Sequence, residues 1–174
     1  HNMGHIRDTV PNHMGIMGRD NKWWLDVLEN GPASPYSQFF DIDWTPLRPE
    51  MHNKVLVPVL GDHYGNILDS GELRLSFDSE NGAFAVEYYE HLFPIDPQTY
   101  PYIFKDSEQC ITEPRQSEDD VLLEFQSLLT AFENLPSRSS TDPQELLARN
   151  RGKELLKQHL PSHYGEHQAG ARIV

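Results

Sequence analysis

The chain contains a single cysteine, Cys110, among its 174 residues, which excludes an internal disulfide. A lone thiol fits a reducing compartment, so we expect a cytoplasmic protein. No apolar run approaches the ~20 residues that a membrane-spanning helix needs. The first residues show neither the charged start nor the apolar centre of a signal peptide. These absences predict a soluble protein with no membrane partner.

Basic residues are also scarce, because 14 Lys and Arg stand against 27 Asp and Glu, for a formal net charge of -13. An acidic surface repels nucleic acid and anionic lipid, so we expect neither as a partner. The histidines His1, His5, His13, His163 and His167 form no zinc-binding motif. We expect them to be solvated or packed, and we expect no metal and no cofactor.

Aromatic residues, by contrast, are concentrated in one region. Residues 14 to 53 predict a long ordered loop with short helical pieces, and the segment from Asn21 to Trp44 holds most of its aromatic side chains. The sequence Asn30-Gly31-Pro32 breaks any helix there. A loop of this length inside a compact domain is uncommon unless it has a function.

A small antiparallel sheet is predicted next. The stretch KVLVPVLG indicates a short edge strand or strand end, interrupted by Pro58. Two alternating runs then predict a hairpin over residues 72–93. Their apolar positions are Leu73, Leu75 and Phe77 in the first run and Phe84, Val86 and Tyr88 in the second. The turn between them contains Asn81 and Gly82, both of which tolerate positive φ.

Two antiparallel helices are predicted at about 118–135 and 143–160. The first has a buried face at Val121, Leu122, Phe125, Leu128, Leu129, Phe132 and Leu135, which follow helical spacing. The second begins with Pro143 at its first position and is expected to end before Pro161. Its apolar positions are Leu146, Leu147, Leu155 and Leu156.

A cluster of polar residues lies near the start of the chain, in the sequence DTVPNH. Thr9-Val10 suits a strand, and Pro11 ends regular pairing because it has no N–H group. Asp8, Asn12 and His13 are therefore gathered where this strand stops. Such a group is typical either of a capped turn or of an active site.

DTVPNH resembles the first sequence region of the α-amylase superfamily, glycoside hydrolase family 13, whose pattern is Asp, three residues, Asn, His. A closer resemblance is to the maltooligosyl trehalose synthase family within that superfamily. It is carried by the segments VPNHMGI, WWLDVLENGPASPYSQFFDIDW, KVLVPVLGDHYGNILDSGEL and YYEHLFPIDPQTYP. It covers residues 1 to 104 strongly, and the helical region to about 160 only in character.

The resemblance implies that this chain is an α+β fragment of a (β/α)8 barrel enzyme. Residues 1–13 would be the third barrel strand and its end. Residues 14–105 would be the excursion domain that follows it, with the long loop and the antiparallel sheet. Residues 106–174 would be a truncated helical segment. Barrel active sites lie at the C-terminal ends of strands, so DTVPNH would lie beside substrate.

The resemblance also implies roles for the strand-end residues. His13 would hydrogen-bond the sugar that becomes the covalent intermediate, Asp8 would support that site, and Asn12 would fix the excursion loop. Asn12 would be a calcium ligand in some relatives, but this family gives no strong reason to expect calcium. Without the flanking resemblance, a locally capped turn is the simpler interpretation.

Four aromatic residues are candidate sugar contacts. Trp23, Trp24 and Trp44 could stack on glucose rings or be buried against the scaffold, and the sequence does not separate these alternatives. Tyr64 lies in the turn GDHYG, where Gly61 and Gly65 indicate a tight, projecting loop.

The reaction implied by the resemblance converts the reducing-end α-1,4 linkage of a maltooligosaccharide into an α,α-1,1 linkage. The catalytic carboxylates of the superfamily come from the fourth, fifth and seventh strands, which by chain order would lie beyond Val174. We therefore expect no catalytic residue in this chain, only the supporting His13, and predict that the chain alone is inactive. The expected partners are the maltooligosaccharide substrate and the rest of the parent barrel.

Three alternatives remain open. The chain could be a self-standing carbohydrate-binding module, which would need no carboxylate pair. It could be a structural or interaction domain, in which case exposed strand and helix faces would drive self-association. It could also belong to another hydrolase of the α-amylase superfamily.

Overall fold

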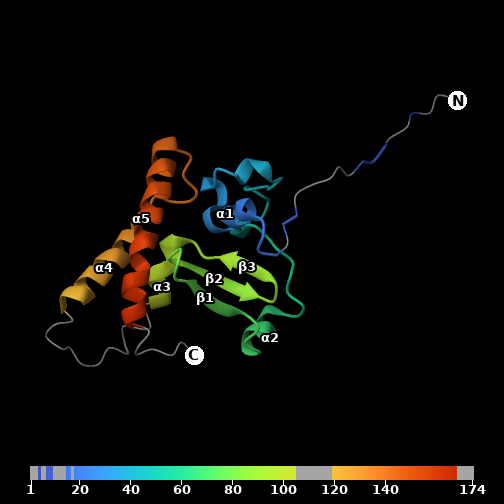
Figure 1. The fold of residues 1–174 in the computed structure, drawn as a ribbon. Helices are drawn as coiled ribbons and strands as arrows, with labels where there is room; N and C mark the ends of the chain where they lie inside the picture. The colour runs from blue at the N-terminus through green and yellow to red at the C-terminus, as the bar shows by residue number, and fades with distance from the viewer. Residues whose placement is uncertain (1–3, 5–6, 10–14, 17, 105–118, 168–174) are drawn as a thin grey trace.

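The computed structural model describes residues 4, 7–9, 15–16, 18–104 and 119–167. Within these ranges the chain forms a three-stranded antiparallel sheet flanked by helices (Figure 1). The strands are β1 (Arg74–Asp78), β2 (Ala83–Tyr88) and β3 (His91–Pro94), in the order β1-β2-β3. The helices are α1 (Lys22–Asn30), α2 (Tyr64–Asp69), α3 (Tyr100–Phe104), α4 (Asp119–Glu133) and α5 (Pro143–His167). Short 3-10 turns occur at Gly31–Ala33, Ser37–Phe39, Pro49–Met51 and Pro97–Thr99.

The predicted hairpin is confirmed, with Leu75 of β1 opposite Val86 of β2. The second run, however, is not one strand to residue 93. It ends at Tyr88, and Tyr89 turns the chain with a positive φ of 49°. The chain returns as β3, with His91 opposite Tyr88. A second turn therefore adds a third strand to the sheet.

The turn between β1 and β2 is shaped by a carboxylate. The Asp78 side chain accepts hydrogen bonds from the backbone N–H groups of Glu80 (3.0 Å) and Asn81 (3.1 Å), and from the Asn81 side-chain amide (2.6 Å). The amide bond from Asn81 is the main cause that lowers the pKa of Asp78. The expected positive φ occurs at Gly82 (59°) but not at Asn81, which acts through its side chain instead.

The stretch KVLVPVLG, residues 54–61, forms no strand, contrary to the expected short edge strand. Pro58 cannot donate to a ladder, and β2 already has β1 and β3 on its two edges. The segment is instead anchored at its last residue, where the Gly61 N–H donates to the Tyr88 hydroxyl at 3.0 Å.

The core lies between β2, α3 and α4. Its buried members are Phe84, Tyr100, Phe104, Phe125, Leu128, Leu129, Phe132, Leu135 and Leu160. The predicted face of the first helix is thus confirmed from Phe125 to Leu135; the side chains of Val121 and Leu122 lie outside the described residues. The buried Tyr100 hydroxyl accepts the N–H of Phe84 at 3.1 Å, and burial raises the pKa of Tyr100, which keeps it neutral.

Helix α5 is longer than predicted, and most of its buried side chains are charged. It continues through Pro161 to His167 rather than ending at about 160. Of its apolar positions, Leu147 and Leu155 are 52% and 58% exposed. The buried side chains of this helix are instead Arg149, Lys153, Lys157 and Leu160, which recur every three or four residues. The helix therefore presents charged side chains to the rest of the chain.

The hairpin turn packs closely against α5 one helical turn before Pro161. Proline has no N–H, so the carbonyl of Lys157, four residues earlier, receives no bond from Pro161. Gly82 lies against this carbonyl, because a Cβ built on Gly82 would be 1.8 Å from the Lys157 oxygen. The turn between β1 and β2 is thus packed against the backbone of α5.

Candidate functional site

Of the candidate sugar-site residues at the predicted strand end, the structure describes Asp8 alone. Asn12 and His13 lie outside the described residues, together with Val10 and Pro11. Asp8 is described and exposed, and residues 7–9 form no strand. A barrel strand needs hydrogen-bonding neighbours, and the sheet described in this chain consists only of β1, β2 and β3. The proposed sugar-site role of Asp8, Asn12 and His13 therefore has no geometry in the described residues.

Helix α1 positions two of the candidate tryptophans. It begins after Asn21, whose side-chain oxygen accepts the N–H of Trp24 at 3.0 Å, as an N-cap residue does. It ends where Gly31 adopts a positive φ of 57°, in agreement with the predicted helix break. Consecutive residues on a helix point about 100° apart, so Trp23 and Trp24 have different surroundings.

Trp24 is a core residue. It is only 5% exposed, and its ring lies 5.0 Å from that of Phe40 in a tilted arrangement. Val27, one turn further along α1, is fully buried on the same side. Of the two alternatives for this tryptophan, the structure favours burial against the scaffold.

Trp23 lies on the outside of α1 and is 43% exposed. Its ring is nearly parallel to that of Tyr36, with an interplanar angle of 12° and a centroid distance of 5.4 Å. Phe39 flanks it at 5.4 Å with a tilt of 58° and is itself 61% exposed. We call these three residues, Trp23, Tyr36 and Phe39, the aromatic surface. They are brought together because the 3-10 turns after α1 fold residues 31–39 back along the helix.

The other two aromatic candidates lie apart from this surface or are partly covered. Trp44 is partly buried, and its carbonyl accepts the N–H of Asn53 at 2.9 Å. Tyr64 is 63% exposed at the first position of α2, a helix rather than the expected tight loop. In Figure 1 the sheet lies between α1 and α2, so Tyr64 is not part of the aromatic surface.

Beneath α1 lies a set of ion pairs that the sequence did not indicate. Glu29 on the buried side of α1 pairs with Lys157 of α5 and lies 3.9 Å from Lys153. Asp26 lies 3.8 Å from Lys153 and accepts the Ser34 hydroxyl at 2.5 Å. The side chains of Lys153 and Lys157 are both almost fully buried. These contacts hold α1 and the turn after it against α5.

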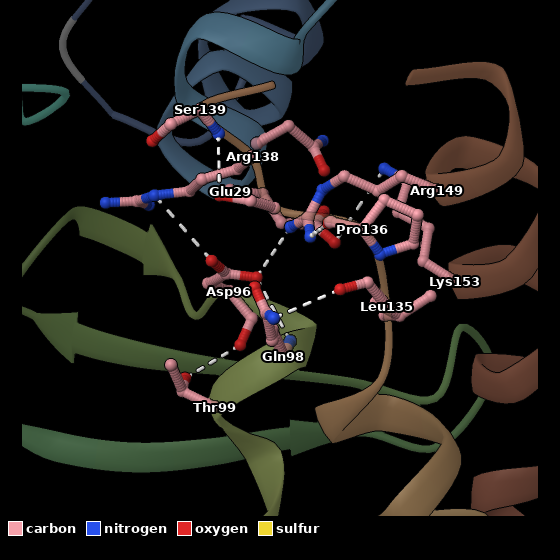
Figure 2. A network of polar contacts seen from close by, with 12 residues as sticks. Glu29, Asp96, Gln98, Thr99, Leu135, Pro136, Arg138, Ser139, Arg149 and Lys153 are labelled. Carbon is pink, nitrogen blue, oxygen red and sulfur yellow. Dashed lines mark hydrogen bonds and ion pairs between the residues drawn. The ribbon is translucent and has the colours of Figure 1, made fainter. Parts of the chain in front are cut away.

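A second charged group joins the sheet to the helical pair (Figure 2). Arg149 is fully buried, and it donates to Asp96 at 2.6 Å and to the carbonyl of Pro136 at 2.7 Å. Arg138 approaches the other oxygen of Asp96 at 3.6 Å. The Gln98 amide donates to the carbonyl of Leu135 at 3.0 Å. Asp96 lies two residues after the end of β3, so this group fixes the end of the sheet to the link between α4 and α5.

The chemistry available to these charged residues is limited. Each of the partly buried carboxylates Asp26, Glu29 and Asp96 contacts a lysine or an arginine. Their oxygens are engaged in contacts within the chain, so their role is to hold these elements together. The part of the chain that is described holds no group of three or more potential metal ligands, and none of its helices is long and apolar enough to cross a membrane.

Comparison with known proteins gives one line of evidence. No protein-family model matches the chain, and no solved structure matches it. Two curated proteins, from two strains of Mycobacterium tuberculosis, are each 39% identical to it over 83 residues. Each is described as a "Putative maltooligosyl trehalose synthase". The match covers 42% of this chain and 10% of each relative, so the chain is similar to a small part of these proteins.

Proposed function

We propose that this chain is part of a maltooligosyl trehalose synthase and forms walls of its substrate site. The observation that carries the proposal is the identity of 39% over 83 residues to relatives with that name. The motif DTVPNH and its flanking segments support the same assignment. On this proposal residues 1–13 belong to the third strand of a (β/α)8 barrel, and residues 14–105 form the excursion that follows it.

The proposed reaction is an intramolecular glucosyl transfer with retention. A carboxylate attacks the anomeric carbon to form a glycosyl-enzyme, and a carboxylic acid protonates the leaving oxygen. The released glucose then returns its anomeric hydroxyl as the acceptor, which forms the α,α-1,1 linkage. On this proposal the reacting carboxylates come from elsewhere in the parent enzyme, and Asp26, Glu29 and Asp96 are engaged with cations of this chain instead.

The contribution of this chain is the exclusion of water and the holding of sugar. Water exclusion decides whether the glycosyl-enzyme is captured by glucose or is hydrolysed. The loop from α1 to residue 44 is a candidate wall because it is rich in aromatic side chains, some of which are exposed. His13, with Asp8 and Asn12, would contact the same substrate from the strand end.

The test is an activity assay on the complete protein that contains this chain, incubated with maltopentaose. The expected result is a loss of reducing ends with little release of glucose, together with a product that has a trehalose end by NMR. The isolated 174-residue chain serves as control and should show no conversion. Release of reducing sugars as the main reaction would assign the protein to a hydrolase instead, and no reaction at all would contradict the proposal.

A further inference from the structure

The exposed aromatic surface raises the question of which ligand it fits. Trp23 keeps 43% of its surface exposed although Tyr36 and Phe39 pack against it. Packing on two sides restricts the ring to one orientation, so little entropy is lost when a ligand covers its open part. Exposed aromatic residues gathered at one place mark an interaction site more often than scattered ones do.

The charge of the chain restricts the class of ligand. Flat aromatic surfaces stack on nucleic-acid bases as well as on the C–H faces of sugars. A chain with a formal net charge of -13 repels a polyanion. An uncharged glucan has an apolar face and meets no such repulsion, so it is the ligand that both the aromatic rings and the charge permit.

We infer that Trp23, held in place by Tyr36 and Phe39, is a stacking subsite for one glucose ring of an α-1,4-glucan. This inference rests on the proposed function, because that function supplies the glucan. It selects one tryptophan of the three, since Trp24 is buried and Trp44 is partly covered. Trp23 is here a binding residue that positions the chain of sugars and takes no part in bond making or breaking.

The ion pairs under α1 explain how this subsite is kept in place. Asp26 and Glu29 lie on α1 three and six residues after Trp23, and both face Lys153 of α5. Ser34, which Asp26 binds, precedes Tyr36 by two residues, and its hydroxyl also accepts the Tyr36 N–H at 3.1 Å. The helix that carries Trp23 and the turn that carries Tyr36 are thus fixed by the same carboxylate.

The first measurement uses the 174-residue chain labelled with 5-fluorotryptophan, in which the three tryptophans give separate 19F NMR signals. Maltopentaose is added, and Trp23→Phe and Trp44→Phe variants assign the signals. We expect a saturable shift of the Trp23 signal, with the buried Trp24 signal unchanged. Cellopentaose, a β-linked glucan, is the control sugar and should shift Trp23 less.

The second measurement compares the kinetic constants of variants of the complete protein. Trp23→Ala should raise KM for maltopentaose about tenfold with a smaller effect on kcat, because a stacking contact is lost. Tyr102→Ala is the matched control, since Tyr102 is an exposed aromatic residue of α3, 68% exposed, and should leave KM unchanged. Trp23→Phe keeps an aromatic face and should fall between wild type and Trp23→Ala. Circular dichroism establishes that each variant is folded.

The outcomes separate this inference from the proposed function. Product formation with an unchanged KM in Trp23→Ala overturns the inference and leaves the proposed function intact. No product, but a saturable 19F shift with maltopentaose, overturns the proposed function and supports the stacking subsite. No product and no shift overturns both. Concentration-dependent dimerisation that Trp23→Ala abolishes, seen by analytical ultracentrifugation without any sugar effect, makes the surface a self-association site and overturns the inference.

Discussion

At the scale of single residues, Asp78 sets the shape of the hairpin turn. Its carboxylate accepts two backbone N–H groups and one side-chain amide from the turn that follows β1. These donors favour the ionised form, and the Asn81 amide is the largest cause of the lowered pKa. The turn is therefore tied to a charge that exists only above acidic pH.

A pH-dependent loss of stability follows for the hairpin. The pKa of Asp78 is lower in the folded state than in the unfolded chain. Its carboxylate therefore stabilises the fold at pH values above the unfolded pKa of about 3.9, and this stabilisation is lost as the pH falls through the folded pKa. Asp78→Asn should lower the free energy of unfolding by about 1 kcal/mol at pH 7, as the loss of an exposed cap does. Thermal melts at pH 7 and at pH 2.5 measure this, and the difference from wild type should shrink in acid.

The matched control for this variant is Glu80→Gln, in the same turn. It removes one negative charge but leaves the Glu80 N–H, which is the group that Asp78 binds. It should leave the pH profile unchanged. An Asp78→Asn variant as stable as wild type at pH 7 would mean that the turn holds its shape without the carboxylate.

At the scale of elements, the hairpin and α5 meet backbone to backbone. Gly82 has a φ of 59° and lies against the carbonyl of Lys157. Pro161 leaves that carbonyl without its usual helical donor at the point where the turn approaches the helix. A side chain cannot be placed at Gly82 unless the two elements separate.

Gly82→Ala should therefore destabilise the chain by roughly 3 kcal/mol or more, since a clash with rigid backbone adds to the strain of positive φ. Gly71→Ala is a close control, because Gly71 has a φ of 71° with nothing within 4 Å of an added Cβ. It should cost only about 1 kcal/mol. Chemical denaturation measures both, and equal costs would mean that the hairpin turn does not touch α5 in solution.

The helices also show what the sequence could and could not predict. The face of α4 from Phe125 to Phe132, with Leu135 just after the helix, follows the helical period with apolar residues, so periodicity was enough to identify it. The buried face of α5 is cationic at Arg149, Lys153 and Lys157, and such residues ordinarily indicate a solvated face. Only the acidic partners on α1 and after β3, far away in the sequence, make that face suitable for burial.

The candidate site, like the helices, was predicted from the sequence only in part. The aromatic composition of residues 21–44 indicated a functional loop. It could not indicate that Trp23 is exposed and Trp24 buried, because this difference depends on which side of the short helix α1 faces the core. The second turn at Tyr89 was missed although Glu90 interrupts the alternation there. No glycine, proline, asparagine or aspartate marks this turn, and a positive φ at tyrosine has no sequence signal. The proposed roles of Asn12 and His13 stay predictions from resemblance.

At the scale of the whole molecule, Asp96 is where the sheet, the α4–α5 link and α5 meet. It lies just after β3 and receives Arg149 from α5 and Arg138 from the link (Figure 2). Its side chain also accepts the N–H of Gln98 at 3.0 Å, which starts the turn leading to the core helix α3. Buried ion pairs of this kind add little net stability when intact but are costly to break on one side.

Arg149→Met should therefore lower the free energy of unfolding by roughly 3–5 kcal/mol, because it leaves Asp96 and the carbonyl of Pro136 without their buried donor. Arg138→Met is the control at the same carboxylate. Its side chain is 28% exposed and 3.6 Å away, so its loss should cost about 1 kcal/mol. Hydrogen exchange should show α3 and α5 losing protection together in Arg149→Met, because both depend on Asp96. Loss confined to α5, with α3 as protected as in wild type, would show instead that the sheet and its core fold without this helix.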